Sequence, residues 1–322
     1  EPANMLPITE VVMDRKDKVF EPALSLSYAK GFDIDHYLRV TESIIAMMSR
    51  VSGLSEKAVT REFILGLKDM AGVCPPKFMR ELVTALRKRW PELVLHYHRH
   101  VTDGLFLPAC AAAAEAGCQI VDAGLGASVR SYGQGDIGSL AAYMEELGLQ
   151  TSLNREALRD ANFVCKQFMP YFDRYCSPYF QGVDHDVIRY AMPGGATSSS
   201  QEGAVKQGYI QLLPYMLDFL AYTRQIVRYH DVTPGSQTTW NTAFLAVTGA
   251  YKRGGLPAVQ QLLSVLKTVT ETKEEDLTEE IKQKRLDTYR DCNEAFQNLL
   301  LGKFGRLPLG FPDDWVYQSA FG

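Results

Sequence analysis

The sequence has few cysteines and none of the paired spacings that mark a thiol-based site. Its six cysteines are Cys74, Cys110, Cys118, Cys165, Cys176 and Cys292, and no two of them are separated by only two residues. This excludes a Cys-x-x-Cys zinc or redox motif. Scattered cysteines, several within apolar helical patterns, also do not indicate a disulfide framework. We therefore expect reduced thiols, as in a cytoplasmic protein.

Long apolar runs and an excess of positive charge are also missing. No segment reaches the roughly 20 apolar residues needed to cross a bilayer, and no basic-then-apolar leader opens the sequence. The 34 lysines and arginines against 38 aspartates and glutamates give a formal net charge of -4. This balance favours neither nucleic acid nor an anionic membrane as a partner. We expect a cytoplasmic location, with the mitochondrial matrix or a peripheral membrane complex as alternatives.

What the first half of the chain does contain is an alternation of short apolar segments with amphipathic ones. The pattern predicts strands at residues 19–28, 63–67, 93–98 and 118–123, and helices at residues 34–52, 76–90, 105–116 and 137–147. Such units predict parallel strands joined by crossovers, in a doubly wound sheet or a β/α barrel. Both folds gather their chemistry at the carboxyl ends of the strands. The polar residues at those ends are Lys68, His98, His100 and Asp122.

After about residue 154 the pattern becomes helical, with no convincing strand. Helical periodicity covers residues 154–175, 200–229, 238–250, 257–270 and 276–301. We therefore expect an α/β domain over residues 1–150 and a helical domain over residues 151–322. The segments 192–200 and 232–237, rich in Pro, Gly and Ser, are expected to be connections between helices.

Half of the chain's six histidines stand at alternate positions of one segment, as His96, His98 and His100. In a strand, alternate side chains share a face and are spaced roughly 6.6 Å apart. Two neighbouring imidazoles suit a divalent transition metal; the other interpretation is that they are polar core residues with satisfied hydrogen bonds. Lys68 can complete a metal site only as a carbamate, because addition of CO2 to the neutral amine creates an anionic oxygen ligand.

Four motifs follow one another along the chain. They are residues 67–72 (LKDMAG), 98–104 (HRHVTDG), 192–195 (MPGG) and 232–234 (VTP). In this order they resemble the carboxyltransferase domain shared by pyruvate carboxylase, the alpha subunit of oxaloacetate decarboxylase and the ketoacid-handling subunit of transcarboxylase. The resemblance extends from about residue 10 to about residue 314, so it covers almost the whole chain.

The resemblance implies a fold and a metal site. The fold is strands five to eight of a TIM (β/α)8 barrel, followed by a helical domain. Lys68 as carbamate, His98 and His100 match the family's metal ligands, and His96 is left as a packed or supporting residue. This donor set suits Zn²⁺, with Mn²⁺ or Co²⁺ as alternatives.

The resemblance also implies a reaction, the movement of CO2 between carboxybiotin and a ketoacid such as pyruvate or oxaloacetate. Biotin would arrive on a separate carrier domain or chain. The family's hydroxyl that relays a proton between the ketoacid and biotin aligns with Ser198, beside Thr197. A hydroxyl suits this role because it can donate and accept a hydrogen bond.

Several departures from the family pattern matter for this interpretation. The PGG loop continues as residues 196–199 (ATSS), and Val101 stands where many members have aspartate. No biotin-bearing lysine motif is present. The family's R-D-x-x-Q segment, with its fourth metal ligand, and its ketoacid-binding arginine are missing as well. Since half a barrel would expose an open sheet edge, we expect a companion chain or an associated segment to supply strands one to four, in a homo-oligomeric complex.

Three functional hypotheses remain from the sequence. The first is the carboxyltransferase component described above. The second is a scaffold or regulatory subunit that keeps the fold without the chemistry, which the missing aspartate and arginine would suit. The third is a metal-dependent aldolase-like lyase, which would use the two histidines but not Lys68.

Overall fold

The computed structural model describes residues 9–11, 21–29, 31–129, 131–173, 175, 182–226, 235–273, 276, 278–289, 294–300 and 303. The chain divides into two compact units, Glu1–Ile188 and Arg189–Gly322. The domain boundary expected at residue 150 stays a prediction, since compactness alone groups residues up to 188 with the first unit. The expected VTP turn at residues 232–234 lies outside the described residues.

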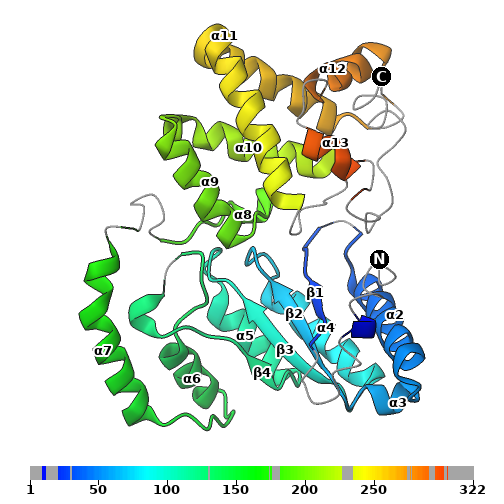
Figure 1. Ribbon diagram of the computed structural model, residues 1–322, viewed down its shortest axis with the longest axis vertical. Helices are drawn as coiled ribbons and strands as arrows, with labels where there is room; N and C mark the ends of the chain where they lie inside the picture. Colours follow the sequence, from blue (N-terminus) through cyan, green and yellow to red (C-terminus); the bar gives the residue numbers. More distant parts are fainter. Residues whose placement is uncertain are drawn as a thin grey trace. The chain divides into compact units, whose positions relative to one another are not determined.

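The first unit is built on a parallel sheet, visible in Figure 1. Its strands are β1 (Ala23–Ser25), β2 (Ile64–Asp69), β3 (Val94–Arg99) and β4 (Ile120–Val121), and they pair in the order β1-β2-β3-β4. A doubly wound sheet reverses its strand order at a switch point. Strict sequence order, with each neighbour parallel, instead matches consecutive strands of a β/α barrel.

Helices follow the strands as the sequence pattern predicts. They are α2 (Ile34–Ser52), α3 (Glu56–Val59), α4 (Pro76–Arg89), α5 (Phe106–Glu115), the short 3-10 helix η2 (Gly126–Ser128), α6 (Ile137–Glu146) and α7 (Arg155–Asp173). The bounds of α2 agree with the prediction because both ends carry clear signals. Asp33 accepts a hydrogen bond from the His36 amide, and Gly53 ends the helix at φ 72°. The one-turn helix α3 was not predicted.

The two faces of this sheet differ in chemistry. On β2 and β3, Leu65, Leu67, Leu95 and Tyr97 have no exposed surface. The residues between them alternate to the other face, where Lys68, His96 and His98 are half-buried. α4 packs against both α2 and α5, and α5 contacts β3. The hydrophobic core therefore lies between the sheet and its helices, and the polar face is left for a site.

Two strands are shorter than predicted. β1 spans three residues of the expected 19–28, of which residues 19 and 20 lie outside the described part of the chain, and β4 spans two residues of the expected 118–123. Among the described strands, β1 and β4 each pair on one side only. A strand with a single neighbour has less pairing to hold it in extended form, which accounts for the shortening.

The helices from residue 187 onward are α8 (Val187–Tyr190), α9 (Gly194–Lys206), the 3-10 helix η4 (Ile210–Leu212), α10 (Leu213–Ile226), α11 (Gly235–Glu271), α12 (Glu279–Tyr289) and α13 (Glu294–Leu300). α11 packs against α10, α12 and α13, around buried residues that include Phe219, Trp240 and Phe296. α11 has non-helical angles at Gly254 and Gly255, between the two helices predicted at 238–250 and 257–270.

The expectation that residues 192–200 form a connection was wrong from Gly194 onward. α9 begins at Gly194, after Pro193 as its N-terminal flanking residue. The Gly and Ser residues of this segment have poor helix propensity, so its composition gave no signal for a helix. In the helix, Thr197 donates to the Pro193 carbonyl (3.0 Å), and Ser198 and Ser199 donate to the carbonyls of Gly195 (3.0 Å) and Ala196 (3.1 Å).

Two other features of the described residues bear on the sequence-based expectations. None of the helices in that part of the chain combines the length and apolarity needed to span a membrane. Cys74, Cys110, Cys118 and Cys165 are free thiols. Cys176 and Cys292 lie outside the described residues, and the expected reduced state stays a prediction.

Candidate metal site

The four polar residues predicted at the strand ends lie in or directly after three neighbouring strands. Lys68 in β2 pairs directly with His98 in β3. His100 follows β3 by one residue, and its ring centroid is 5.4 Å from that of His98. Asp122 follows β4. Parallel pairing thus brings residues that are distant in sequence to one edge of the sheet.

The His98 ring is fixed by hydrogen bonds at both nitrogens. Its Nδ1 lies 2.7 Å from Asp122 Oδ2, and its Nε2 lies 3.2 Å from the Gln134 side-chain nitrogen. Partial burial opposes ionisation of Asp122, but hydrogen bonds from His98 and His96 lower its pKa overall. An ionised Asp122 requires the proton on Nδ1, so Nε2 carries the lone pair. This is the arrangement by which carboxylates orient metal-binding histidines.

His100 is made a neutral donor by burial. Its surface is only 8% exposed. Burial, followed by the nearby positive charges of His98, Lys68 and Arg99, lowers the pKa of His100 to about 4. Its Nδ1 is buried and has no hydrogen-bond partner among the described residues. A neutral imidazole with an unused nitrogen suits a metal ligand.

His96, one layer deeper on the same face, is already committed to carboxylates. Its Nδ1 lies 2.7 Å from Glu21 Oε1, and its Nε2 lies 2.7 Å from Asp122 Oδ1. Burial lowers its pKa, but the two carboxylates outweigh burial and raise it. With both nitrogens occupied, His96 supports Asp122 and is not free to bind a cation.

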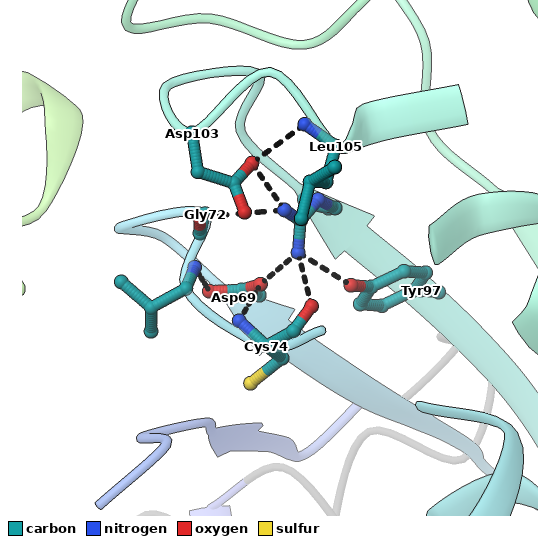
Figure 2. Close-up of polar contacts among 8 residues, drawn as sticks. Asp69, Gly72, Cys74, Tyr97, Asp103 and Leu105 are labelled. Carbon is teal, nitrogen blue, oxygen red and sulfur yellow. Dashed lines mark hydrogen bonds and ion pairs between the residues drawn. The ribbon is translucent and has the colours of Figure 1, made fainter. Parts of the chain in front are cut away.

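A buried charge cluster lies on the face of the sheet opposite to His96 and His98, since Arg99 alternates with them along β3. Figure 2 shows Asp69 and Asp103, the two carboxylates of this cluster. Arg99 Nη1 donates to Asp69 Oδ2 (2.7 Å) and to the Cys74 carbonyl (2.6 Å), and Nη2 donates to the Gly72 carbonyl (3.3 Å) and to Asp103 Oδ1. The side chains of Arg99 and Asp69 have no exposed surface. Burial opposes the charge on Arg99, but the interactions with Tyr97, Asp69 and Asp103 outweigh it and raise the pKa of Arg99.

Sequence reasoning missed this cluster, although a signal was present. Arg99 shares its strand face with Leu95 and Tyr97, which the apolar pattern places in the core. A charged residue in such a position needs a buried partner of opposite charge. Asp69 and Asp103, one residue beyond Lys68 and three beyond His100, were the available candidates.

The backbone of the loop after β2 comes unusually close to His100. Gly72 has φ 68°, and a Cβ added to it would lie 2.7 Å from the His100 carbonyl oxygen. The His100 amide also donates to the Asp69 carbonyl (3.1 Å). Only glycine fits here, so the loop that follows Lys68 is pressed against the segment that follows His98.

The predicted hydroxyl residues belong to the second unit. Thr197 is buried, and its Oγ1 donates to the carbonyls of Met192 (3.2 Å) and Pro193 (3.0 Å). Ser198 is half-buried and donates to the Gly195 carbonyl. Both stand in the first turns of α9.

The side chains at this edge of the sheet determine which metal ligands are available. Within the described part of the chain, no group of three or more His, Cys, Asp or Glu side chains is arranged to hold a metal ion. His98 and His100 supply two nitrogen donors, and the adjacent Lys68 can supply a third donor only in carboxylated form. The donor set therefore fits a metal ion on the condition that Lys68 carries CO2.

Comparison with protein families accounts for most of the chain. A model described as HMGL-like matches residues 5–164, and a model described as conserved carboxylase domain matches residues 187–322. Among curated proteins, pyruvate carboxylase of Schizosaccharomyces pombe is 29% identical over 209 residues, which are 62% of this chain and 16% of that protein. Mitochondrial pyruvate carboxylase of Mus musculus is 27% identical over 232 residues, 68% of this chain and 19% of the relative.

Solved structures agree with the fold. The carboxyl transferase domain of Rhizobium etli pyruvate carboxylase matches with a TM-score of 0.73 and 22% identity, over 96% of this chain and 46% of that domain. The chain thus spans less than a fifth of its curated relatives and about half of the solved domain. The predicted fold class, a half barrel followed by helices, is confirmed. Both family models match, one over each part of the chain, and the four motifs occur in the order found in the family. The chain belongs to the carboxyltransferase domains of biotin-dependent carboxylases.

Proposed function

We propose that this chain is the metal-binding part of a biotin-dependent carboxyltransferase that moves CO2 between carboxybiotin and a ketoacid, pyruvate or oxaloacetate. The observation that carries the proposal is the pairing of Lys68 with His98 on adjacent strands, with His100 one residue beyond β3. Relatives named pyruvate carboxylase support the choice of ketoacid.

In this proposal Lys68, His98 and His100 hold Zn²⁺, or alternatively Mn²⁺ or Co²⁺. Lys68 acts after its neutral amine has added CO2, which releases one proton and leaves an anionic carbamate oxygen. When bound, a divalent cation supplies Lewis acidity toward the ketoacid carbonyl. Gln134 must move away from His98 Nε2, because its amide takes up that lone pair in the structure.

Asp122 and His96 have supporting parts in this scheme. Asp122 holds the His98 proton on Nδ1, so that the ring presents Nε2 in one orientation. His96 in turn fixes the second oxygen of Asp122, and Glu21 fixes His96. The line of hydrogen bonds from Glu21 to His98 keeps the ligand ring from rotating.

We assign the proton relay between ketoacid and biotin to Ser198, with Thr197 beside it. Ser198 is only half-buried and its hydroxyl bonds to the Gly195 carbonyl (3.0 Å), which it can exchange for a substrate atom. Thr197 is buried and already donates to two carbonyls, which suits it to hold the first turn of α9 in shape.

We also infer that barrel strands one to four come from a companion chain or another segment. The described sheet leaves β1 and β4 with one neighbour each, and an open edge favours pairing with further strands. A second support is an apolar stripe on α7, made of Val164, Phe168 and Tyr171, which are 51%, 57% and 71% exposed. Exposed apolar surface of this kind marks an interface.

The completing half would supply the aspartate ligand and the ketoacid-binding arginine that this chain lacks. A biotin carrier domain would deliver carboxybiotin, and we expect the assembled complex to be a homo-oligomer. A cytoplasmic or mitochondrial setting suits these partners, since mammalian relatives are named mitochondrial.

The test is metal content and carboxyl transfer in the purified complex. We expect one transition metal ion per chain and ketoacid-dependent transfer, and we expect the substitution Lys68→Ala to abolish both. Lys88→Ala, a change at an exposed lysine of α4, is the matched control and should retain them.

Other outcomes would select the other hypotheses. A complex without bound transition metal, and without a chain carrying an R-D-x-x-Q motif, would indicate a scaffold subunit. Full metal content and activity in the Lys68→Ala variant would eliminate the carbamate and favour an aldolase-like lyase.

A further inference from the structure

The residue between the two proposed histidine ligands points away from them. Arg99 alternates with His98 and His100 along β3, so its side chain leaves the sheet on the face that packs against helices. The Arg99 side chain is fully buried there. It therefore cannot contact a cation held by the histidines, and its influence on them has to be indirect.

One guanidinium group joins the two segments that carry the ligands. Toward the segment after Lys68, it donates to Asp69 Oδ2 and to the carbonyls of Gly72 and Cys74. Toward the segment after His100, it donates to Asp103 Oδ1. Figure 2 shows Asp69, Gly72 and Cys74 of the first loop and Asp103 of the second within one group of hydrogen bonds.

The carboxylates transmit this fixation to the loop backbones. Asp69 accepts hydrogen bonds from the amides of Val73 (2.9 Å) and Cys74 (3.0 Å), which closes the loop after β2. Asp103 accepts from the Leu105 amide (2.9 Å) at the start of α5. The Asp69 carbonyl accepts a hydrogen bond from the His100 amide. Because Asp69 directly follows Lys68, this bond links the backbone beside Lys68 to His100.

We propose that Arg99 is a positioning residue that sets the spacing of Lys68 relative to His98 and His100. This inference rests on the proposed metal site and adds a determinant of its geometry. Arginine suits the task because its planar fork reaches several acceptors at fixed angles. Lysine carries the same charge but has a single ammonium group, so it cannot join both loops in this geometry.

The experiment measures Zn²⁺ affinity of the purified complex by competition with a chelator, together with the thermal unfolding midpoint. Removal of groups that orient metal ligands typically weakens binding about 10–100-fold, and we expect a loss of that size for Arg99→Lys. The matched control is Arg87→Lys, at a half-buried arginine of α4 that donates to the Leu93 carbonyl. It should leave Zn²⁺ affinity unchanged.

A second variant guards against loss of folding. Removing one partner of a buried ion pair is far more destabilising than removing all partners together. The triple variant Arg99→Met with Asp69→Asn and Asp103→Asn leaves no buried charge in the cluster, so it should fold and still bind Zn²⁺ about 10–100-fold more weakly.

Two results would overturn the positioning role. One is a folded Arg99→Lys or triple variant with wild-type Zn²⁺ affinity. The other is failure of both variants to fold, which would assign the cluster to stability. Failure of the proposed function looks different, because then the wild-type complex and its Arg87→Lys control would themselves bind no Zn²⁺.

Discussion

At the scale of single residues, the two histidines of the candidate site are held by different surroundings. His98 is held by an ionised carboxylate, which fixes its tautomer. His100 is held by burial among positive charges, which keeps its pKa near 4. One ring of the site is thus oriented by Asp122, and the other is kept neutral by its surroundings.

A third histidine allows a test of pH linkage away from the site. His36 lies in the first turn of α2, with its ring 5.1 Å from the rings of Phe32 and Tyr37. Burial, followed by the charge of Arg39, lowers the pKa of His36 below its usual 6.5, and Asp33 opposes them only in part. The folded protein therefore binds fewer protons at this position than the unfolded chain.

The sign of the effect follows from this shift. The stability linked to His36 is fully present above pH 6.5 and is lost as the pH falls through the lowered pKa. We expect the free energy of unfolding of the wild type to decrease relative to His36→Gln between about pH 7.5 and about pH 5. Denaturant titrations at several pH values measure this free energy for both proteins. Parallel curves of unfolding free energy against pH would refute the lowered pKa of His36.

At the scale of elements, the loop after β2 carries the tightest constraint on the site. A Cβ at Gly72 would meet the His100 carbonyl oxygen at 2.7 Å, at a φ of 68°. Gly53 after α2 has a similar φ of 72° but open space around it. Replacing either glycine by alanine carries the cost of a positive φ. Only at Gly72 would the added methyl group also clash with a neighbour.

This pair gives a controlled prediction. Gly53→Ala should cost about 1–2 kcal/mol in free energy of unfolding, the penalty of a left-handed residue with a side chain. Gly72→Ala should cost more, because the loop or the His100 backbone must also shift. Equal losses in denaturant unfolding would show that the loop is not pressed against His100.

The elements also show what the sequence can and cannot predict. The amphipathic pattern predicts α2 at residues 34–52, and short apolar segments predict β2 and β3. The start of α9 at Gly194 was missed because the Gly and Ser residues of this segment have poor helix propensity. β1 and β4 were predicted too long, because pairing with neighbours decides the length of an edge strand and no local pattern encodes it.

The candidate site was predictable to a similar degree. Lys68, His98 and His100 stand out through motif spacing and strand alternation. The links of Asp122 to both histidines and of Arg99 to two aspartates could not be read from the sequence. They depend on which strands are neighbours and on the register between them.

At the scale of the whole molecule, the apolar stripe of α7 gives the inferred companion a testable docking surface. Val164, Phe168 and Tyr171 recur at helical spacing and are more than half exposed. The Phe168→Ser, Tyr171→Ser double variant should fold with little change, because exposed substitutions typically alter stability by less than about 0.5 kcal/mol.

Binding of the companion segment to the double variant should nevertheless weaken. The companion segment is first identified by mass spectrometry of the purified complex. The measurement is then how much of this segment the chain captures. We expect weaker capture by the double variant and normal capture by Lys166→Ser with Gln167→Ser, a control at exposed polar positions of the same helix. Undiminished capture by the double variant would place the interface elsewhere.

The most direct measurement of the central claim is an anomalous-scattering map of the crystallised complex at the zinc absorption edge. The account predicts a peak about 2.0–2.1 Å from one nitrogen each of His98 and His100, with extra density for a carboxyl group on Lys68 Nζ. A map with no peak between the rings, and with an unmodified amine at Lys68, would contradict it.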